Sequence, residues 1–98
     1  MSERPGVEII DQVIAVIAQR QKEMPPDSYV AECLRRGWPY IARKLIEEAT
    51  EASIAAREES DERLASEISD LIFFALVVLA HRGVDAEKVW AELSLRRR

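Results

Sequence analysis

The sequence has few of the residues that build turns, crosslinks and sheet corners. Its 98 residues include three glycines, four prolines and one cysteine. So few turn-forming residues disfavour a β-sandwich, which needs many tight turns. The lone thiol, Cys33, excludes an intrachain disulfide and is typical of a protein kept in a reducing compartment. These absences favour an all-α fold without covalent staples.

Two further features are missing, a membrane-spanning apolar run and a basic stripe. The apolar run 71–80 is about half the length that crosses a bilayer. The N-terminus carries Glu3 and Glu8 and does not resemble a signal peptide. The net charge is −4, and residues 47–70 hold nine acidic and two basic side chains, which disfavours a nucleic-acid surface. We expect a soluble, cytoplasmic protein that binds neither nucleic acid nor membrane.

Length and composition indicate one domain over residues 1–98. The chain is 48% hydrophobic and 33% charged, which is too apolar for a disordered segment. A domain of this size buries a modest share of its surface, so oligomerisation is an expected source of extra core. Residues 71–80 are apolar all round, and such a helix must be covered on every side. A homodimer with this segment near the shared core is the economical arrangement.

Apolar spacing and helix-end signals predict a bundle of four to five helices. Apolar residues from Val7 to Ile17 follow the three-and-four spacing of an amphipathic helix. The expected stops and caps are Pro25–Pro26, Asp27 or Ser28, Gly37, Ser60–Asp61, Gly83 and Asp85. They predict one helix before residue 25, a short one before Gly37, a third over about 38–59, a fourth ending at 82 and a last one after Asp85. The fold is therefore expected to be all-α and completed by homodimerisation.

Acidic residues on the third predicted helix border its apolar stripe. At about 100° per residue, Glu47, Glu48 and Glu51 fall within about 100° of one another, beside the apolar stripe and not opposite it. Lys44 shares this face. On the fourth predicted helix, Glu67 is flanked by apolar neighbours at Leu64, Leu71 and Phe74, with Asp70 close by.

A run of charge is often only a wet helix surface, and that interpretation stays open here. An isolated buried carboxylate is costly, however, and protonates unless a cation pairs with it. Carboxylates spaced by three and four residues converge on one point of a helix surface, and a hard cation such as Mg²⁺ binds oxygen ligands. The placement of Glu67 therefore favours a metal site over a solvated face.

The pattern Glu-Glu-x-x-Glu, then fifteen residues, then Glu-x-x-Asp resembles the signature of MazG-like nucleotide pyrophosphohydrolases. The segments Ser28–Tyr29, Leu34, Gly37 and 44–51 are similar, more narrowly, to the phosphoribosyl-ATP pyrophosphohydrolase family of histidine biosynthesis. The likeness covers about residues 25–93. Ile46 and Phe73–Phe74 depart from the family pattern, which often has Gly and Tyr-His there; these departures bear on substrate choice and leave the reaction class intact.

The resemblance implies hydrolysis of phosphoribosyl-ATP to phosphoribosyl-AMP and pyrophosphate by a metal-activated water. The implied Mg²⁺ ligands, with Mn²⁺ as the alternative metal, are Glu48, Glu51, Glu67 and Asp70. Glu47 is implied as a supporting ligand or the base for the water. Lys44 holds a phosphate or balances the charge of the glutamates. The remaining substrate-binding candidates are Ser28, Tyr29, Arg35 and Arg36.

Two other functions remain open from the sequence. The first is a housekeeping nucleoside triphosphate pyrophosphohydrolase that uses the same carboxylates on another base and sugar. The second is a non-catalytic acidic helical dimer that binds a partner or a metal. The first predicts pyrophosphate release from a broad range of nucleotides, and the second predicts no turnover.

Overall fold

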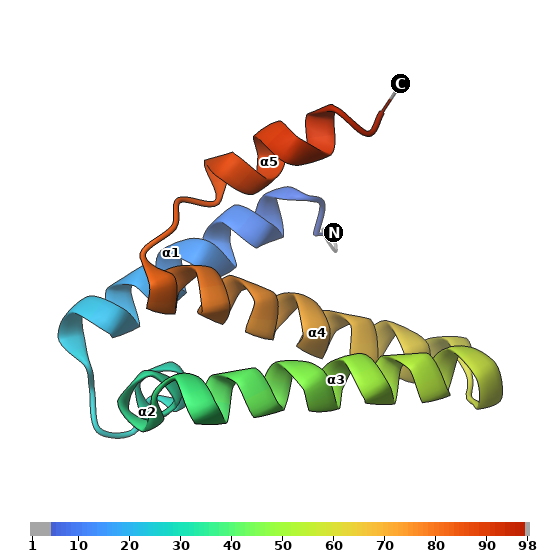
Figure 1. Cartoon of the computed structure of the whole chain (residues 1–98), viewed down its shortest axis with the longest axis horizontal. Helices are drawn as coiled ribbons and strands as arrows, with labels where there is room; N and C mark the ends of the chain where they lie inside the picture. The colour runs from blue at the N-terminus through green and yellow to red at the C-terminus, as the bar shows by residue number, and fades with distance from the viewer. Residues whose placement is uncertain (1–4, 98) are drawn as a thin grey trace, which may run out of the picture.

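Five helices make up the regular structure of the chain in a computed structural model that describes residues 5–97. They are α1 (Glu8–Glu23), α2 (Tyr29–Arg36), α3 (Trp38–Glu58), α4 (Asp61–Arg82) and α5 (Glu87–Ser94). Figure 1 shows α3 and α4 as a long antiparallel pair, with α1 along the other side of α4 and α2 at the start of α3. The prediction of an all-α bundle is confirmed.

Serine side chains cap the N-termini of α2 and α4, as the sequence predicts. Ser28 Oγ accepts a hydrogen bond from the Ala31 N–H at 3.1 Å, and Ser60 Oγ accepts one from the Arg63 N–H at 3.2 Å. Each bond satisfies one of the amide hydrogens that lack a partner in the first turn of a helix. The Ser28 hydroxyl group therefore serves as the N-cap of α2.

Left-handed backbone ends α2 and α4. Gly37 has φ of 82° and Gly83 has φ of 75°, values that cost little energy only for glycine. Gly37 joins α2 directly to α3, so the last turn of α2 and the first turn of α3 lie close together.

Two predicted boundaries differ by a residue. α3 ends at Glu58, because Glu59 takes an extended backbone (φ −124°, ψ 179°) that leads into the cap at Ser60. The last helix begins at Glu87 with Ala86 at the cap position, and Asp85 Oδ1 accepts a hydrogen bond from the Glu87 N–H at 2.9 Å. Asp85, the expected cap, therefore forms a turn one residue ahead of the observed cap position.

The core lies where α1, α2, α3 and α4 meet. Its largest fully buried side chains are Ile17, Cys33, Ile41 and Val77, one from each of these helices. Phe74 and Leu76 of α4 pack into the same cluster. Within the described residues, α5 contributes no buried side chain, so the four-helix core sets the positions of the carboxylates.

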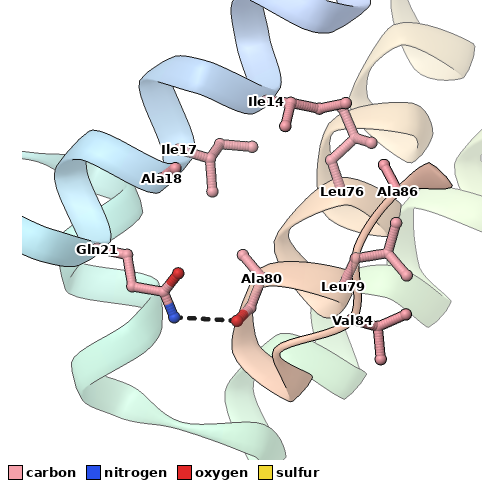
Figure 2. A pocket seen from close by; sticks show the side chains of 9 residues that line it. All are labelled: Ile14, Ile17, Ala18, Gln21, Leu76, Leu79, Ala80, Val84 and Ala86. Atoms are coloured by element: carbon pink, nitrogen blue, oxygen red, sulfur yellow. Dashed lines mark hydrogen bonds between the residues drawn. The ribbon is translucent and has the colours of Figure 1, made fainter.

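A polar contact anchors α1 to the end of α4. Gln21 Nε2 donates a hydrogen bond to the Ala80 carbonyl oxygen at 2.9 Å (Figure 2). A small cavity of about 70 Å³ lies beside it, lined mainly by apolar side chains such as Ile14, Ile17 and Leu79. The same carbonyl oxygen also accepts a hydrogen bond from the Gly83 N–H at 3.1 Å, so this end of α4 is held both by its own cap and by α1.

One face of the α1–α4 pair is apolar and open. Ile9, Ile68 and Ile72 are each at least 40% exposed, and they border a groove of about 540 Å³. By length and composition α4 could also cross a membrane, with a mean hydropathy of 1.8, but the core helix of a soluble protein meets the same criterion. Glu67 and Asp70 lie within α4, and hydrocarbon would leave such charges without partners.

Candidate active site

Three of the predicted carboxylates meet between α3 and α4. Oxygens of Glu48, Glu67 and Asp70 all lie within 4.8 Å of one another. Glu67 and Asp70 share a face of α4 because they are three residues apart. The short turn at residues 59–60 makes α3 and α4 antiparallel neighbours, and Glu48 and Asp70 lie at similar distances along the chain from that turn.

Two members of this triad are buried. Glu48 is 6% exposed and Glu67 is 4% exposed, whereas Asp70 reaches solvent. Burial removes water from a carboxylate and penalises its charged form. The triad therefore combines a dry interior side with one open edge, through which an ion or a phosphate could enter.

Each buried carboxylate has one paired oxygen and one free oxygen. Lys44 Nζ lies 3.4 Å from Glu48 Oε1, and Arg63 Nη2 lies 3.2 Å from Glu67 Oε1. The other oxygens, Glu48 Oε2 and Glu67 Oε2, are buried and have no hydrogen-bond partner among residues 5–97. Buried unpaired acceptors are costly, and hard divalent cations bind such oxygens. The donor set therefore fits Mg²⁺.

The surroundings of Glu67 hinder its ionisation. Loss of hydration raises the pKa of its carboxyl, and the nearby Glu51 and Asp70 carboxylates raise it further, whereas Arg63 lowers it. A divalent cation in the triad would reverse this balance, because it favours the charged form of every ligand. Glu51 is exposed and lies beside Glu67, outside the three converging carboxylates.

Lys44 lies between the buried and the exposed glutamates. Its Nζ is 3.3 Å from Glu47 Oε1 and 3.4 Å from Glu48 Oε1. Burial alone would lower the pKa of this ammonium, but Glu47 and Glu48 outweigh it and raise the pKa. Arg43 also pairs with Glu47, at 3.4 Å. Glu47 is thus held by two cations at the edge of the triad.

The predicted substrate-binding residues of α2 separate into two groups. Ser28 caps the helix, and Arg35 donates hydrogen bonds to the carbonyl oxygens of Met24 (3.4 Å) and Pro25 (2.9 Å). These two side chains hold the α1–α2 connection. Tyr29 and Arg36 instead lie on the side of α2 that meets Tyr40 of α3.

Tyr29 and Tyr40 link α2 to α3 near the triad. Their hydroxyl groups share a hydrogen bond of 2.9 Å, and the Tyr29 ring packs against Phe73 and Phe74 of α4. Loss of hydration and the bond to Tyr40 raise the pKa of the Tyr29 phenol, so it stays neutral. Phe73–Phe74, where the family pattern often has Tyr-His, thus form an apolar wall behind Tyr29.

Sequence reasoning missed Tyr40, Arg43 and Arg63 as residues of this region. Arg63 precedes Glu67 by four residues, a spacing that predicts an ion pair on one helix face. Tyr40 precedes Lys44 by the same interval, so the face of α3 that carries the glutamates also carries Tyr40. These spacings could have identified Arg63 and Tyr40, and the same four-residue interval from Arg43 to Glu47 could have identified Arg43.

Cys33 takes no part in this region as a nucleophile. Its side chain is fully buried, and burial raises the pKa of the thiol. A thiol that is hard to ionise is a poor nucleophile. The Cys33 side chain instead packs in the core.

Comparison with known proteins gives a match to the family Phosphoribosyl-ATP pyrophosphohydrolase over residues 10–97. The phosphoribosyl-ATP pyrophosphatase of Saccharolobus solfataricus is 42% identical over 91 residues, which cover 93% of this chain and 97% of the relative. That of Rhodospirillum rubrum is 44% identical over 96 residues, which cover 98% of this chain and 82% of the relative. The resemblance drawn from the carboxylate spacing is confirmed, and the chain belongs to the phosphoribosyl-ATP pyrophosphohydrolase family.

Proposed function

We propose that this chain hydrolyses phosphoribosyl-ATP between its α and β phosphates, with Mg²⁺ held by Glu48, Glu67 and Asp70. The products are phosphoribosyl-AMP and pyrophosphate, as in histidine biosynthesis. The observation that carries the metal assignment is the pair of buried, unpartnered oxygens, Glu48 Oε2 and Glu67 Oε2, in a triad with Asp70. Without a cation these oxygens would be a stability defect.

The chemistry needs charge neutralisation and positioning more than covalent help from the protein. When bound, Mg²⁺ supplies positive charge to phosphate oxygens and lowers the pKa of a coordinated water. Glu51, beside Glu67, is the proposed fourth ligand. Mn²⁺ prefers similar oxygen ligands and is the expected substitute.

Lys44 and Glu47 act at the edge of the triad in this proposal. The Lys44 ammonium stays charged because its pKa is raised, so it can transfer from the glutamates to a substrate phosphate. Glu47, freed from Lys44 by that transfer, can accept the proton of the attacking water or support the metal. Its half-exposed side chain lies on the same helix face as Glu51.

The active protein is proposed to be a cytoplasmic homodimer. Its shared core would bury the open groove bordered by Ile9, Ile68 and Ile72. Such an apolar patch on a small domain is typical of an interface. Sedimentation at micromolar concentration should give the mass of a dimer, and a stable monomer would contradict this part of the proposal.

The direct test is pyrophosphate release from phosphoribosyl-ATP and from a panel of nucleoside triphosphates, each with Mg²⁺ and with a chelator. We expect turnover of phosphoribosyl-ATP that disappears on chelation. Equal turnover across the panel would favour the housekeeping nucleotide pyrophosphohydrolase. Absence of turnover with every substrate would favour the non-catalytic acidic dimer.

A further inference from the structure

We propose a second anion-binding subsite, formed by Arg36, Tyr40 and Arg43. It binds the single phosphate on the second ribose of the substrate, which the reaction leaves unchanged. The inference rests on the proposed hydrolysis of phosphoribosyl-ATP and specifies how the chain selects that substrate. The cluster lies where α2 meets α3, and its Tyr40 precedes Glu48 of the carboxylate triad by eight residues.

Two guanidinium groups gather at one aromatic ring. The Arg36 Cζ lies 4.2 Å from the centre of the Tyr40 ring, and the Arg43 Cζ lies 5.3 Å from it. Both distances are within the range of a cation–π interaction. The Tyr40 hydroxyl is hydrogen-bonded to Tyr29, which orients the ring. Because the Tyr40 ring holds the two guanidinium groups close together, one anion can bind both of them.

Few protein groups compete for the two arginines, so both are available to bind an anion. Among residues 5–97, Arg36 forms no ion pair, and Arg43 pairs only with Glu47, at 3.4 Å with a side chain 59% exposed. Exposed ion pairs of this kind contribute little free energy, so an anionic ligand can compete with Glu47. Arg35 differs, because carbonyl oxygens and Glu32 already hold its guanidinium.

The cluster is aligned with the triad along one helix face. Tyr40, Lys44, Glu47 and Glu51 follow one another at intervals of four, three and four residues. Tyr40 precedes Glu48 by eight residues, which is about 12 Å along the helix axis. Residues 35–44 hold four basic and no acidic side chains, whereas residues 47–70 are strongly acidic. The end of α2 and the first turns of α3 are therefore cationic, and the length of α3 beyond them carries the carboxylates.

The substrate carries a matching distribution of charge. Phosphoribosyl-ATP has a triphosphate on one ribose and a single phosphate on a second ribose, with adenine between them. The two ends cannot share one metal site, so the single phosphate needs cations of its own. Arginine binds phosphate through paired, charge-assisted hydrogen bonds. Because ATP and other nucleoside triphosphates lack that phosphate, a subsite for it would distinguish the substrate from them.

Product inhibition separates this subsite from the triad. Phosphoribosyl-AMP and AMP share the phosphate next to the cleaved bond, and only phosphoribosyl-AMP carries the distal phosphate. The inhibition constants of both would be measured for the parent, for the double variant Arg36→Ala/Arg43→Ala, and for Arg57→Ala. Arg57 is an exposed arginine fourteen residues beyond Arg43, about 21 Å farther along the axis of α3, so it is the matched control for lost charge.

We expect the inhibition constant of phosphoribosyl-AMP to rise at least about tenfold in the double variant, the scale of losing charge-assisted hydrogen bonds. The constant of AMP should change by less than about twofold, and Arg57→Ala should leave both near the parental values. Equal changes for the two inhibitors, or none, would overturn the subsite. Thermal unfolding of each variant checks that the fold is retained.

A single variant keeps the test decisive if the double variant unfolds. Arg36→Gln removes one charge without breaking an ion pair within the described residues, and it should weaken phosphoribosyl-AMP selectively. If it leaves the ratio of the two inhibition constants unchanged, Arg36 does not bind the phosphate and the proposal is wrong. Failure of the proposed function is separate, because it is seen in the parent as absent or metal-independent hydrolysis.

Discussion

Replacing Glu67 with glutamine tests whether the triad exists to hold a metal. The side chain is 4% exposed, with one oxygen paired to Arg63 and the other unpartnered. Glutamine keeps the shape and one carbonyl oxygen but removes the charge. Because the surroundings raise the pKa of Glu67, charge at this position is unfavourable without a cation. Metal-free Glu67→Gln should therefore fold normally and be at least as stable as the parent.

With Mg²⁺ present, the parent should be more stable than Glu67→Gln. A ligand present at about 100 times its dissociation constant stabilises a protein of this size by about 10–20 °C in Tm. The parent should gain a shift of that scale, and Glu67→Gln should lose most of it, because one of three converging ligands is gone. Turnover should fall by at least about 10²-fold, the scale of losing one preorganised electrostatic contact.

Thermal unfolding with chelator and with Mg²⁺, together with pyrophosphate release, measures all three quantities. Glu58→Gln is the matched control, since Glu58 is an exposed acid at the end of α3 and outside the triad. It should keep the parental Mg²⁺ shift and turnover. Near-parental turnover of Glu67→Gln, or a full Mg²⁺ shift, would refute the metal-binding assignment of the triad.

Three further outcomes follow from the same structure. Because the folded state raises the pKa of Glu67, the metal-free protein should lose stability as pH rises from about 4.5 toward neutrality, and Mg²⁺ should abolish this trend; Tm measured against pH with a chelator checks it. Ile72→Glu puts a charge on the open apolar groove, so sedimentation should show the proposed homodimer dissociating, while an exposed change such as Arg57→Glu should not have this effect. Cys33 should react with thiol reagents only on unfolding, because its thiol is buried and its pKa is raised; rapid labelling of the folded protein would contradict this.

Helix ends could be predicted because their causes are local. Ser28 and Ser60 cap helices with their own hydroxyl groups, and Gly37 and Gly83 adopt positive φ that other residues resist. The cap of the last helix was predicted at Asp85, one residue early. Aspartate can accept a hydrogen bond from an amide two residues ahead in a turn as readily as it caps a helix. Sequence alone does not distinguish the two geometries.

The triad was predictable in part. The spacing of Glu67 and Asp70, and the apolar neighbours of Glu67, follow from helix geometry alone. That Glu48, and not Glu47 or Glu51, completes the group depends on how α3 rotates against α4. That rotation is set by the packing of side chains such as Ile41 and Val77 in the core, which no single helix specifies.

No sequence pattern predicts that each buried carboxylate has one paired and one free oxygen. This arrangement requires Lys44 and Arg63 to reach one oxygen each, from one turn earlier on their own helices, while the core shields the other. The cations reduce the repulsion among Glu48, Glu67 and Asp70 without saturating them, so the apo protein can fold while keeping oxygens for a metal. A third cation directly on the free oxygens would stabilise the fold further and close the site. The unpaired oxygens are therefore a stability cost that metal binding would offset.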